Sequence, residues 1–199
     1  MTVAGSSLQM NLSLSGVRLS VDWYPQFLSS EESQALFDYL EASVPWTKDI
    51  TPGRRVNQNY GDPGVSYKLT FGDKVIVREV LPWDQCSVLK VVKDRLESLT
   101  EARYNYCALL RYPNGKVGIA PHRDKEIKSG TCIAGISLGA TRKFKLLPPY
   151  YAQCAPIELT LPPGSLYVLR PPTNDCWAHC IEPDPTVKEP RISLTYRLN

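Results

Sequence analysis

The chain has 199 residues, of which 43% are hydrophobic and 22% charged, a composition typical of globular proteins long enough to bury one core. These values exclude a disordered or fibrous chain, and the absence of any apolar run of about 18 residues argues against a transmembrane protein. The net charge of +3 is too small to require a polyanionic partner, but it allows a locally basic groove.

The first residues, MTVAGSSLQMNLSLSG, are Ser-rich and polar and predict a flexible tail over residues 1–15. They lack the basic start and continuous apolar stretch of a signal peptide, so we expect an intracellular protein, and a nuclear one if the organism is a eukaryote. The six cysteines have no framework spacing and are expected to be free thiols. We expect a single domain over residues 16–199, a monomer, and no association with a membrane.

Two helices are expected in the N-terminal half. Ser29 and Glu32 have the spacing of a capping box, and the apolar residues that follow recur at helical spacing until Pro45. A second helix is expected in residues 83–100, WDQCSVLKVVKDRLESLT, where one apolar stripe is formed by Val88, Leu89, Val92, Leu96 and Leu99.

From Tyr104 onward the chain consists of short runs rich in aliphatic, β-branched and aromatic residues, separated by Pro and Gly. This pattern predicts a mostly β (α+β) fold, an antiparallel sandwich or barrel with the two helices against it. Tight turns are expected at residues 162–164 and 171–172. The predicted strands are YNYCALLRY, TCIAGISLG, RKFKLLP, IELTL, SLYVLR, CWAHCIE and RISLTYRL.

The segment GIAPHRDKE, residues 118–126, contains one of the only two histidines in the chain. On a strand, His122, Asp124 and Glu126 would share one face. The other histidine, His179, lies on a later predicted strand. Two histidines and one carboxylate form the facial triad of non-haem iron, which leaves positions open for a bidentate oxo-acid and dioxygen. By itself His-x-Asp is weak evidence, because ordinary histidines and a solvated aspartate give the same pattern.

A zinc site is an alternative for the second histidine. Cys176, His179 and Cys180 lie close together in the sequence and could supply ligands. No second clustered pair of cysteine or histidine residues is present to complete a closed tetrahedron. The remaining cysteines are expected to act as small core residues.

The last predicted strand, PRISLTYR, alternates charged or polar residues with apolar ones. Its polar face would hold two arginines, Arg191 and Arg197, with Ser193 and Thr195 between them. Because a guanidinium matches a carboxylate bidentately, a dicarboxylic acid with one end on the metal would satisfy this face. Two surface arginines paired with Asp or Glu are the alternative.

These motifs resemble the AlkB family of Fe(II)/2-oxoglutarate dioxygenases. The likeness covers about residues 20 to 198 and rests on RYPNGKVGIAPHRDKE, GISLGATRKFKL, LPPGSLYVLRPPTNDCWAHCI and PRISLTYR, which occur in the family's order. NYGDPGVSY and HRDKE resemble the eukaryotic homologs that repair duplex DNA. The resemblance implies a double-stranded β-helix (jelly-roll) core at about 104–198, N-terminal helices, and a nucleotide-recognition lid at about 46–72.

The resemblance also implies a site and a reaction. In that reaction 2-oxoglutarate and O2 yield succinate and CO2, and an N-alkyl carbon is hydroxylated and released as an aldehyde. Arg191 would bind the distal carboxylate of 2-oxoglutarate and Arg197 would lie near the carboxylate beside the metal. The implied catalytic iron ligands are His122, Asp124 and His179, and the implied 2-oxoglutarate residues are Tyr112, Arg191, Ser193 and Arg197.

The implied substrate is an alkylated base in nucleic acid, with DNA preferred. Tyr67 and the ring of His122 would sandwich an extruded base, and Glu126 would share a proton with its exocyclic amine. Tyr67 can alternatively be a core aromatic residue. The duplex branch has an aromatic residue two positions after this tyrosine, where this chain has Leu69.

A basic loop precedes the expected lid. Lys48 and Arg55 would meet phosphates, and Ile50 would wedge into a base step, although a solvated basic loop fits the same residues. Two positions depart from the family pattern, because Leu110 and Ser193 stand where asparagines are usual. The alternatives are therefore the same chemistry on RNA, on a regulatory modified base or on a protein, or a non-catalytic module that binds alkylated DNA.

Overall fold

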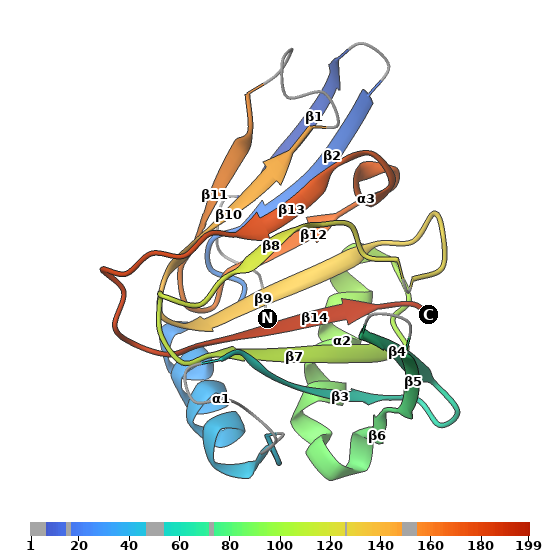
Figure 1. The fold of residues 1–199 in the computed structure, drawn as a ribbon, viewed down its shortest axis with the longest axis vertical. Helices are drawn as coiled ribbons and strands as arrows, with labels where there is room; N and C mark the ends of the chain where they lie inside the picture. Colours follow the sequence, from blue (N-terminus) through green and yellow to red (C-terminus); the bar gives the residue numbers. More distant parts are fainter. Residues whose placement is uncertain (1–6, 15–16, 47–53, 72–73, 126, 149–154) are drawn as a thin grey trace.

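The computed structural model describes residues 7–14, 17–46, 54–71, 74–125, 127–148 and 155–199. Two β-sheets face each other and form the body of the protein (Figure 1). The smaller sheet has the order β11 (Ile157–Leu161), β10 (Arg142–Leu147), β13 (Ala178–Ile181) and β8 (Ile119–His122). The larger sheet has the order β1 (Leu8–Leu14), β2 (Val17–Tyr24), β12 (Leu166–Leu169), β9 (Ile133–Gly139), β14 (Arg191–Arg197), β7 (Tyr106–Tyr112), β3 (Val56–Gly61) and β6 (Leu81–Pro82).

Both faces of the larger sheet are covered, and each has its own hydrophobic core. One core lies between this sheet and the helices, and it includes Leu36, Leu96 and Leu194. The other lies between the two sheets and includes Val21, Phe144 and Trp177, which come from or adjoin strands of both sheets. The mostly β prediction is confirmed, and two facing sheets with a shared core are consistent with a jelly-roll.

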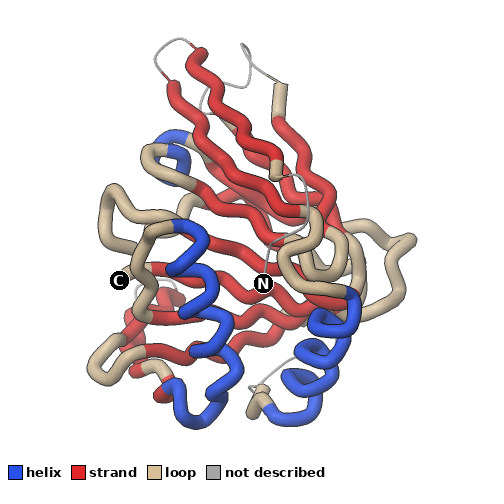
Figure 2. The backbone as a smooth tube through the Cα atoms, turned by 180° about the vertical axis from the view of Figure 1, so that it is seen from behind, coloured by secondary structure: helices blue, strands red, loops and turns tan. Residues whose placement is uncertain are grey.

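The two predicted helices are confirmed. The Oγ atom of Ser29 accepts a hydrogen bond from the Glu32 N–H at 3.1 Å, and the Glu32 carboxylate accepts one from the Ser29 N–H at 2.8 Å, so the capping box begins α1 (Ser30–Ser43). The second helix consists of the 3₁₀ turn η1 (Trp83–Cys86) followed by α2 (Ser87–Thr100). Seen from behind (Figure 2), α1 and α2 lie against the same face of the larger sheet.

The structure contains a short helix that the sequence did not predict, α3 (Thr173–Cys176). It follows the predicted turn at Pro171 and Pro172 and leads into β13. The side chain of Thr173 anchors it, because its Oγ1 donates to the Ser20 carbonyl at 2.9 Å and accepts from the Ser20 N–H at 2.7 Å. The segment that leads into β13 of the smaller sheet is therefore hydrogen-bonded to β2 of the larger sheet.

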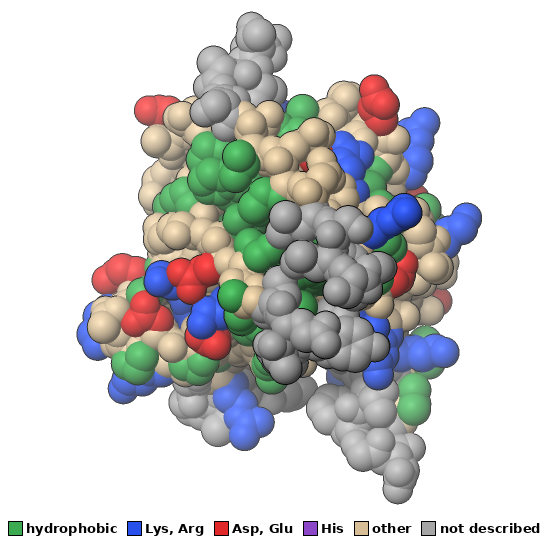
Figure 3. All heavy atoms as spheres, turned by 90° about the horizontal axis from the view of Figure 1, so that it is seen from above, with side chains coloured by type: hydrophobic (Ala, Val, Ile, Leu, Met, Phe, Trp, Pro, Cys, Tyr) green, Lys and Arg blue, Asp and Glu red, His purple; other side chains and the backbone are tan. Residues whose placement is uncertain are grey.

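The predicted flexible tail at residues 1–15 is wrong for residues 8–14, which form strand β1. Leu8 pairs with Trp23 at one end of the β1–β2 ladder, and Met10 packs against the core between the sheets. The sequence LQMNLSL alternates apolar and polar residues with the period of a strand, a signal outweighed in the prediction by the high serine content. Figure 3 shows hydrophobic side chains exposed at this end of the molecule.

The region predicted as a lid, residues 46–72, divides into two structures. Its strand β3 belongs to the larger sheet and pairs with β7 along its whole length. Strands β4 (Ser66–Phe71) and β5 (Lys74–Glu79) form a separate antiparallel hairpin at the edge of the body, near the end of β14 (Figure 1). Only this hairpin is separate from the core sheets in the described part of the region.

No helix in the described residues is long and apolar enough to cross a bilayer. The five described cysteines are free thiols, as expected, and their sequence positions are Cys86, Cys107, Cys132, Cys176 and Cys180.

Candidate metal centre and co-substrate pocket

His122 and His179 are brought together by the pairing of β8 with β13. They are direct partners in the strand register, and their ring centroids are 4.4 Å apart. The Nδ1 atom of His122 lies 2.9 Å from the Ala120 carbonyl, a contact that orients the ring. Its Nε2 lies 3.7 Å from Oδ1 of Asp124. The two histidines far apart in the sequence are therefore neighbours beside the predicted carboxylate.

Asp124 is close to both histidines, but not for the reason that the sequence suggested. Strand β8 ends at His122, so the alternation of a strand does not place Asp124. Its carboxylate instead forms an ion pair with Arg197, with Nη2 and Oδ2 2.8 Å apart. Glu126, expected on the same strand face, lies outside the described residues.

The three side chains form a site suited to a metal ion. Ligand atoms of His122, Asp124 and His179 all lie within 4.8 Å of one another, and among the described residues this group includes neither Cys176 nor Cys180. Two imidazoles and one carboxylate are the donor set of non-haem Fe(II), and the zinc alternative has no support in this geometry.

The electrostatics of His179 also fit a metal ligand. Burial lowers its pKa to about 4; Asp124 acts in the opposite direction, and His122 and Arg197 lower the pKa further. The imidazole is therefore neutral at physiological pH, which is the form that binds a metal. Its buried Nδ1 atom has no hydrogen-bond partner among the described residues.

A pocket between the sheets begins at the two histidines and extends to Arg191 on β14. Arg191 is 2% exposed, and its Nε donates a hydrogen bond to Ser137 Oγ at 2.8 Å. Its Nη1 atom is buried without a partner in the described part of the chain. Because an unpaired buried cation is unfavourable, the arrangement fits an anion that enters the pocket and accepts this donor.

Tyr112 forms the wall of the pocket beside Arg191. The guanidinium carbon of Arg191 lies 5.2 Å from the centre of the Tyr112 ring, and that of Arg142 lies 5.9 Å from it. Arg142, which the sequence analysis did not single out, donates to the carbonyls of Val117 and Glu182. Arg142 thus holds together the segments after β7 and after β13. Its Nε is buried without a partner in the described residues, as Nη1 of Arg191 is, but of the two arginines only Arg191 lines the pocket.

β14 has the two-faced pattern that the sequence predicted. Ile192, Leu194 and Tyr196 are buried in the core beneath the helices. The alternate residues line the pocket on the opposite face; they are Arg191, Ser193, Thr195 and Arg197.

Comparisons with known proteins agree with this geometry. The family model of the 2OG-Fe(II) oxygenase superfamily matches residues 20–197. The DNA oxidative demethylase ALKBH2 of Mus musculus is 34% identical over 72% of this chain and 61% of its own length. The alpha-ketoglutarate-dependent dioxygenase alkB homolog 3 of Homo sapiens is 30% identical over 95% of this chain and 69% of its own length. The chain belongs to the AlkB family of 2-oxoglutarate- and Fe(II)-dependent oxygenases.

A solved structure of OsALKBH1 is similar in fold, with a TM-score of 0.64 at 14% identity, over 96% of this chain and 100% of that one. The chain spans between half and two thirds of the length of the ALKBH2 proteins of Mus musculus and Bos taurus. The AlkB family uses Fe(II), 2-oxoglutarate and O2. The unpaired Nδ1 atom of His179 fits a ligand of Fe(II), and the unpaired Nη1 atom of Arg191 fits a donor to a carboxylate of 2-oxoglutarate.

The two positions that depart from the AlkB pattern are neighbours in the structure. Leu110 on β7 is the direct register partner of Ser193 on β14, and both line the pocket between the arginines. The amides that are usual at these positions are therefore missing from one row of the pocket wall. Ser193 keeps a hydroxyl there, 3.5 Å from Nη2 of Arg191.

The sequence analysis missed the two aromatic residues Phe144 and Tyr167, which line the pocket. The ring of Tyr167 stacks on Phe144 at 4.4 Å and covers Gly135 so closely that a Cβ atom there would lie 2.1 Å from its Cζ. Glycine is thus required at residue 135 by the close approach of this ring. The Gly in GISLG is the only sequence signal of this contact.

The residues expected to contact the substrate are only partly described. Tyr67 lies on β4 and belongs to neither hydrophobic core, so the core alternative is not supported. It lines an open groove of about 690 Å³ together with Lys68, Lys125 and Lys128. The Arg55 guanidinium donates to the Gly118 carbonyl at 2.9 Å and lies 6.0 Å from the centre of the Tyr112 ring. Lys48 and Ile50 lie outside the described residues.

Proposed function

We propose that this AlkB-family protein is a 2-oxoglutarate-dependent dioxygenase that removes alkyl groups from nitrogen atoms of nucleobases, with damaged DNA as substrate. One observation supports it most: the triad of His122, Asp124 and His179 opens into a pocket whose far end is a buried arginine with an unused donor. A metal and a dicarboxylate co-substrate would occupy the two ends of this pocket together.

The residues of the pocket have separate roles in this proposal. Fe(II) held by His122, Asp124 and His179 would activate O2, the oxidant: one oxygen atom would enter succinate as 2-oxoglutarate loses CO2, and the other would enter the alkyl carbon as a hydroxyl group. Arg191 binds the distal carboxylate of 2-oxoglutarate, with Ser193 and Tyr112 beside it. Arg197 is held by the Tyr106 hydroxyl at 3.2 Å, so its charge fixes the carboxylate of Asp124 from the side. The hydroxylated alkyl group then leaves as an aldehyde.

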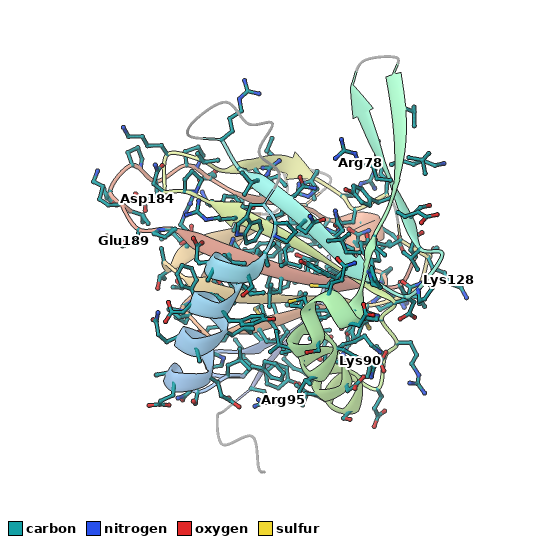
Figure 4. All side chains as sticks on the ribbon, turned by 90° about the horizontal axis from the view of Figure 1, so that it is seen from below. Arg78, Lys90, Arg95, Lys128, Asp184 and Glu189 are labelled. Carbon is teal, nitrogen blue, oxygen red and sulfur yellow. The ribbon has the colours of Figure 1, made fainter. Side chains whose placement is uncertain are left out.

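The groove beside the hairpin is where we place the nucleic acid. Its described lining residues include three lysines and no Asp or Glu, a composition that favours phosphates. Tyr67 supplies a ring on which a base can stack. Arg78 is the cross-strand partner of Tyr67, and Figure 4 shows Arg78 on the hairpin and Lys128 near its base. We therefore assign the β4–β5 hairpin as the lid.

DNA is preferred to RNA because the relative from Mus musculus is named as a DNA demethylase. The same metal and co-substrate pocket would act on RNA, on a regulatory modified base or on a protein side chain if the groove bound one of these in place of damaged DNA. A non-catalytic module that binds alkylated DNA is a second candidate, favoured by the loss of two amides at Leu110 and Ser193. The roles of Glu126, Lys48 and Ile50, the nuclear location and the monomeric state stay predictions.

The test is mass spectrometry of methylated oligonucleotides incubated with the protein, Fe(II) and 2-oxoglutarate. Single- and double-stranded DNA and RNA are compared, with His179→Ala as the control. Loss of methyl groups from DNA in the wild type alone is the expected result. Succinate without any change in the oligonucleotides would refute the substrate, and binding of methylated DNA without succinate would support the non-catalytic module.

A further inference from the structure

Asp124 is held by a side chain that belongs to neither the metal triad nor the co-substrate pocket. Its backbone N–H donates to Oδ1 of Asn174 at 2.9 Å, and its backbone carbonyl accepts from Nδ2 of Asn174 at 2.8 Å. The amide of Asn174 thus occupies both backbone hydrogen-bonding groups of Asp124, as a neighbouring strand would. This replaces the pairing that β8 loses when it ends at His122.

Asn174 is itself in a fixed position. It is 8% exposed and lies in α3, whose first residue, Thr173, is fully buried and joined to Ser20. The turn closes through a hydrogen bond from the N–H of Trp177 to the Thr173 carbonyl at 2.7 Å. Because this turn is anchored, the side chain of Asn174 can hold the backbone of Asp124 in a fixed position.

The same turn leads directly to the second histidine of the triad. β13 begins at Ala178, so the anchored segment is continuous with His179. A further hydrogen bond joins the two segments, because Nη1 of Arg123 donates to the Asp175 carbonyl at 2.6 Å. Two consecutive residues of the loop, Arg123 and Asp124, are therefore hydrogen-bonded to the segment that precedes His179.

We propose that Asn174 is a positioning residue for the metal centre: it sets the place of the Asp124 carboxylate relative to His122 and His179 without touching the metal. Arg197 neutralises and orients the carboxylate, whereas Asn174 fixes the backbone from which it projects. Partners of this kind typically change metal affinity by about 10- to 100-fold. The inference rests on the assignment of the metal ligands and is independent of the nucleic-acid substrate.

The chain contains a matched control. Asn105 holds the backbone of Asn199 in the same way, accepting from its N–H at 2.8 Å and donating to its carbonyl at 3.1 Å. Asn105 and Asn199 are not members of the metal triad. A substitution at Asn105 therefore removes the same pair of hydrogen bonds without loosening the loop that holds Asp124.

The experiment measures binding of Mn(II) alone, from the electron paramagnetic resonance signal of the free ion, with no co-substrate and no turnover. The variants are Asn174→Leu, which keeps the volume of the side chain, Asn174→Ala, and the control Asn105→Leu. We expect both Asn174 variants to weaken Mn(II) binding by about 10- to 100-fold, while Asn105→Leu binds as the wild type does. Hydrogen exchange of the Asp124 amide in the metal-free protein should accelerate only in the Asn174 variants.

Mn(II) affinity within twofold of the wild type in the Asn174 variants would overturn the proposal, and so would equal weakening in Asn105→Leu. If neither Asn174 variant folds, Asp124 amide exchange in the wild type decides, since exchange as fast as in an unprotected amide overturns it. A wild type that binds no Mn(II) refutes the ligand assignment as well. If the wild type and the variants bind Mn(II) as expected but the wild type does not demethylate nucleic acid, only the proposed substrate is refuted.

Discussion

Leu110 offers a test in which a substitution should improve the protein. Its side chain lines the pocket between Arg191 and Arg197, opposite Ser193 in the strand register. Leu110→Asn introduces an amide donor at that place, where a carboxylate of 2-oxoglutarate would lie. A hydrogen bond to a charged group contributes about 1.5 to 3 kcal/mol, so the Kd for 2-oxoglutarate should fall by about 10- to 150-fold.

Binding is measured by isothermal titration of 2-oxoglutarate into Mn(II)-loaded protein without oxygen, so that no turnover occurs. Leu110→Ala is the matched control, because it opens the same space without adding a donor. We expect Leu110→Asn to bind more tightly than both the wild type and Leu110→Ala. If Leu110→Asn binds no better than Leu110→Ala, the carboxylate does not lie beside this residue and our placement of the co-substrate is wrong.

Three further predictions concern the metal, the pocket wall and the folded state. His179→Ala should abolish turnover because it removes a neutral metal ligand, and normal succinate formation in this variant would refute the assignment. Gly135→Ala should destabilise the protein by about 1 to 3 kcal/mol in urea unfolding and weaken 2-oxoglutarate binding, because a Cβ atom would displace Tyr167; unchanged values for both would refute the close contact. Burial acts to raise the pKa of Glu97, but the Tyr104 N–H and the Lys93 ammonium outweigh it and lower the pKa below 4.5. The wild type should therefore be more stable than Glu97→Gln above about pH 4.5, by a margin that shrinks as the pH falls through the lowered pKa; urea unfolding that shows a margin independent of pH would contradict this.

The elements that local sequence determines were predicted well. The capping box at Ser29 and the apolar stripe of α2 depend on residues within one or two turns of each other, and both helices begin as expected. The alternation on β14 likewise requires only a period of two, and it correctly separated the pocket face from the core face. In each case the residues within one element were sufficient.

The sequence analysis expected His122, Asp124 and His179 to form one site, but it did not predict the contacts between distant segments that bring them together. Nothing in the sequence shows that His179 pairs with His122, because that register is set by two strands from separate parts of the chain. The placement of Asp124 depends on Asn174, which lies between the turn predicted at residues 171–172 and the next predicted strand, where no element was expected. Strand β1 was missed because its stability comes from pairing with β2, which a polar segment does not reveal by composition.

The division of β14 into two faces has a consequence for how this protein can change over time. Replacement of Ile192, Leu194 or Tyr196 alters the packing beneath the helices, so it changes how much folded protein a cell retains. Replacement of Ser193 or Thr195 alters the pocket and leaves that packing in place. Natural selection therefore acts differently on residues that are adjacent in β14. Substitutions at Ser193 and Thr195 can change the co-substrate preference while the core residues between them stay constant.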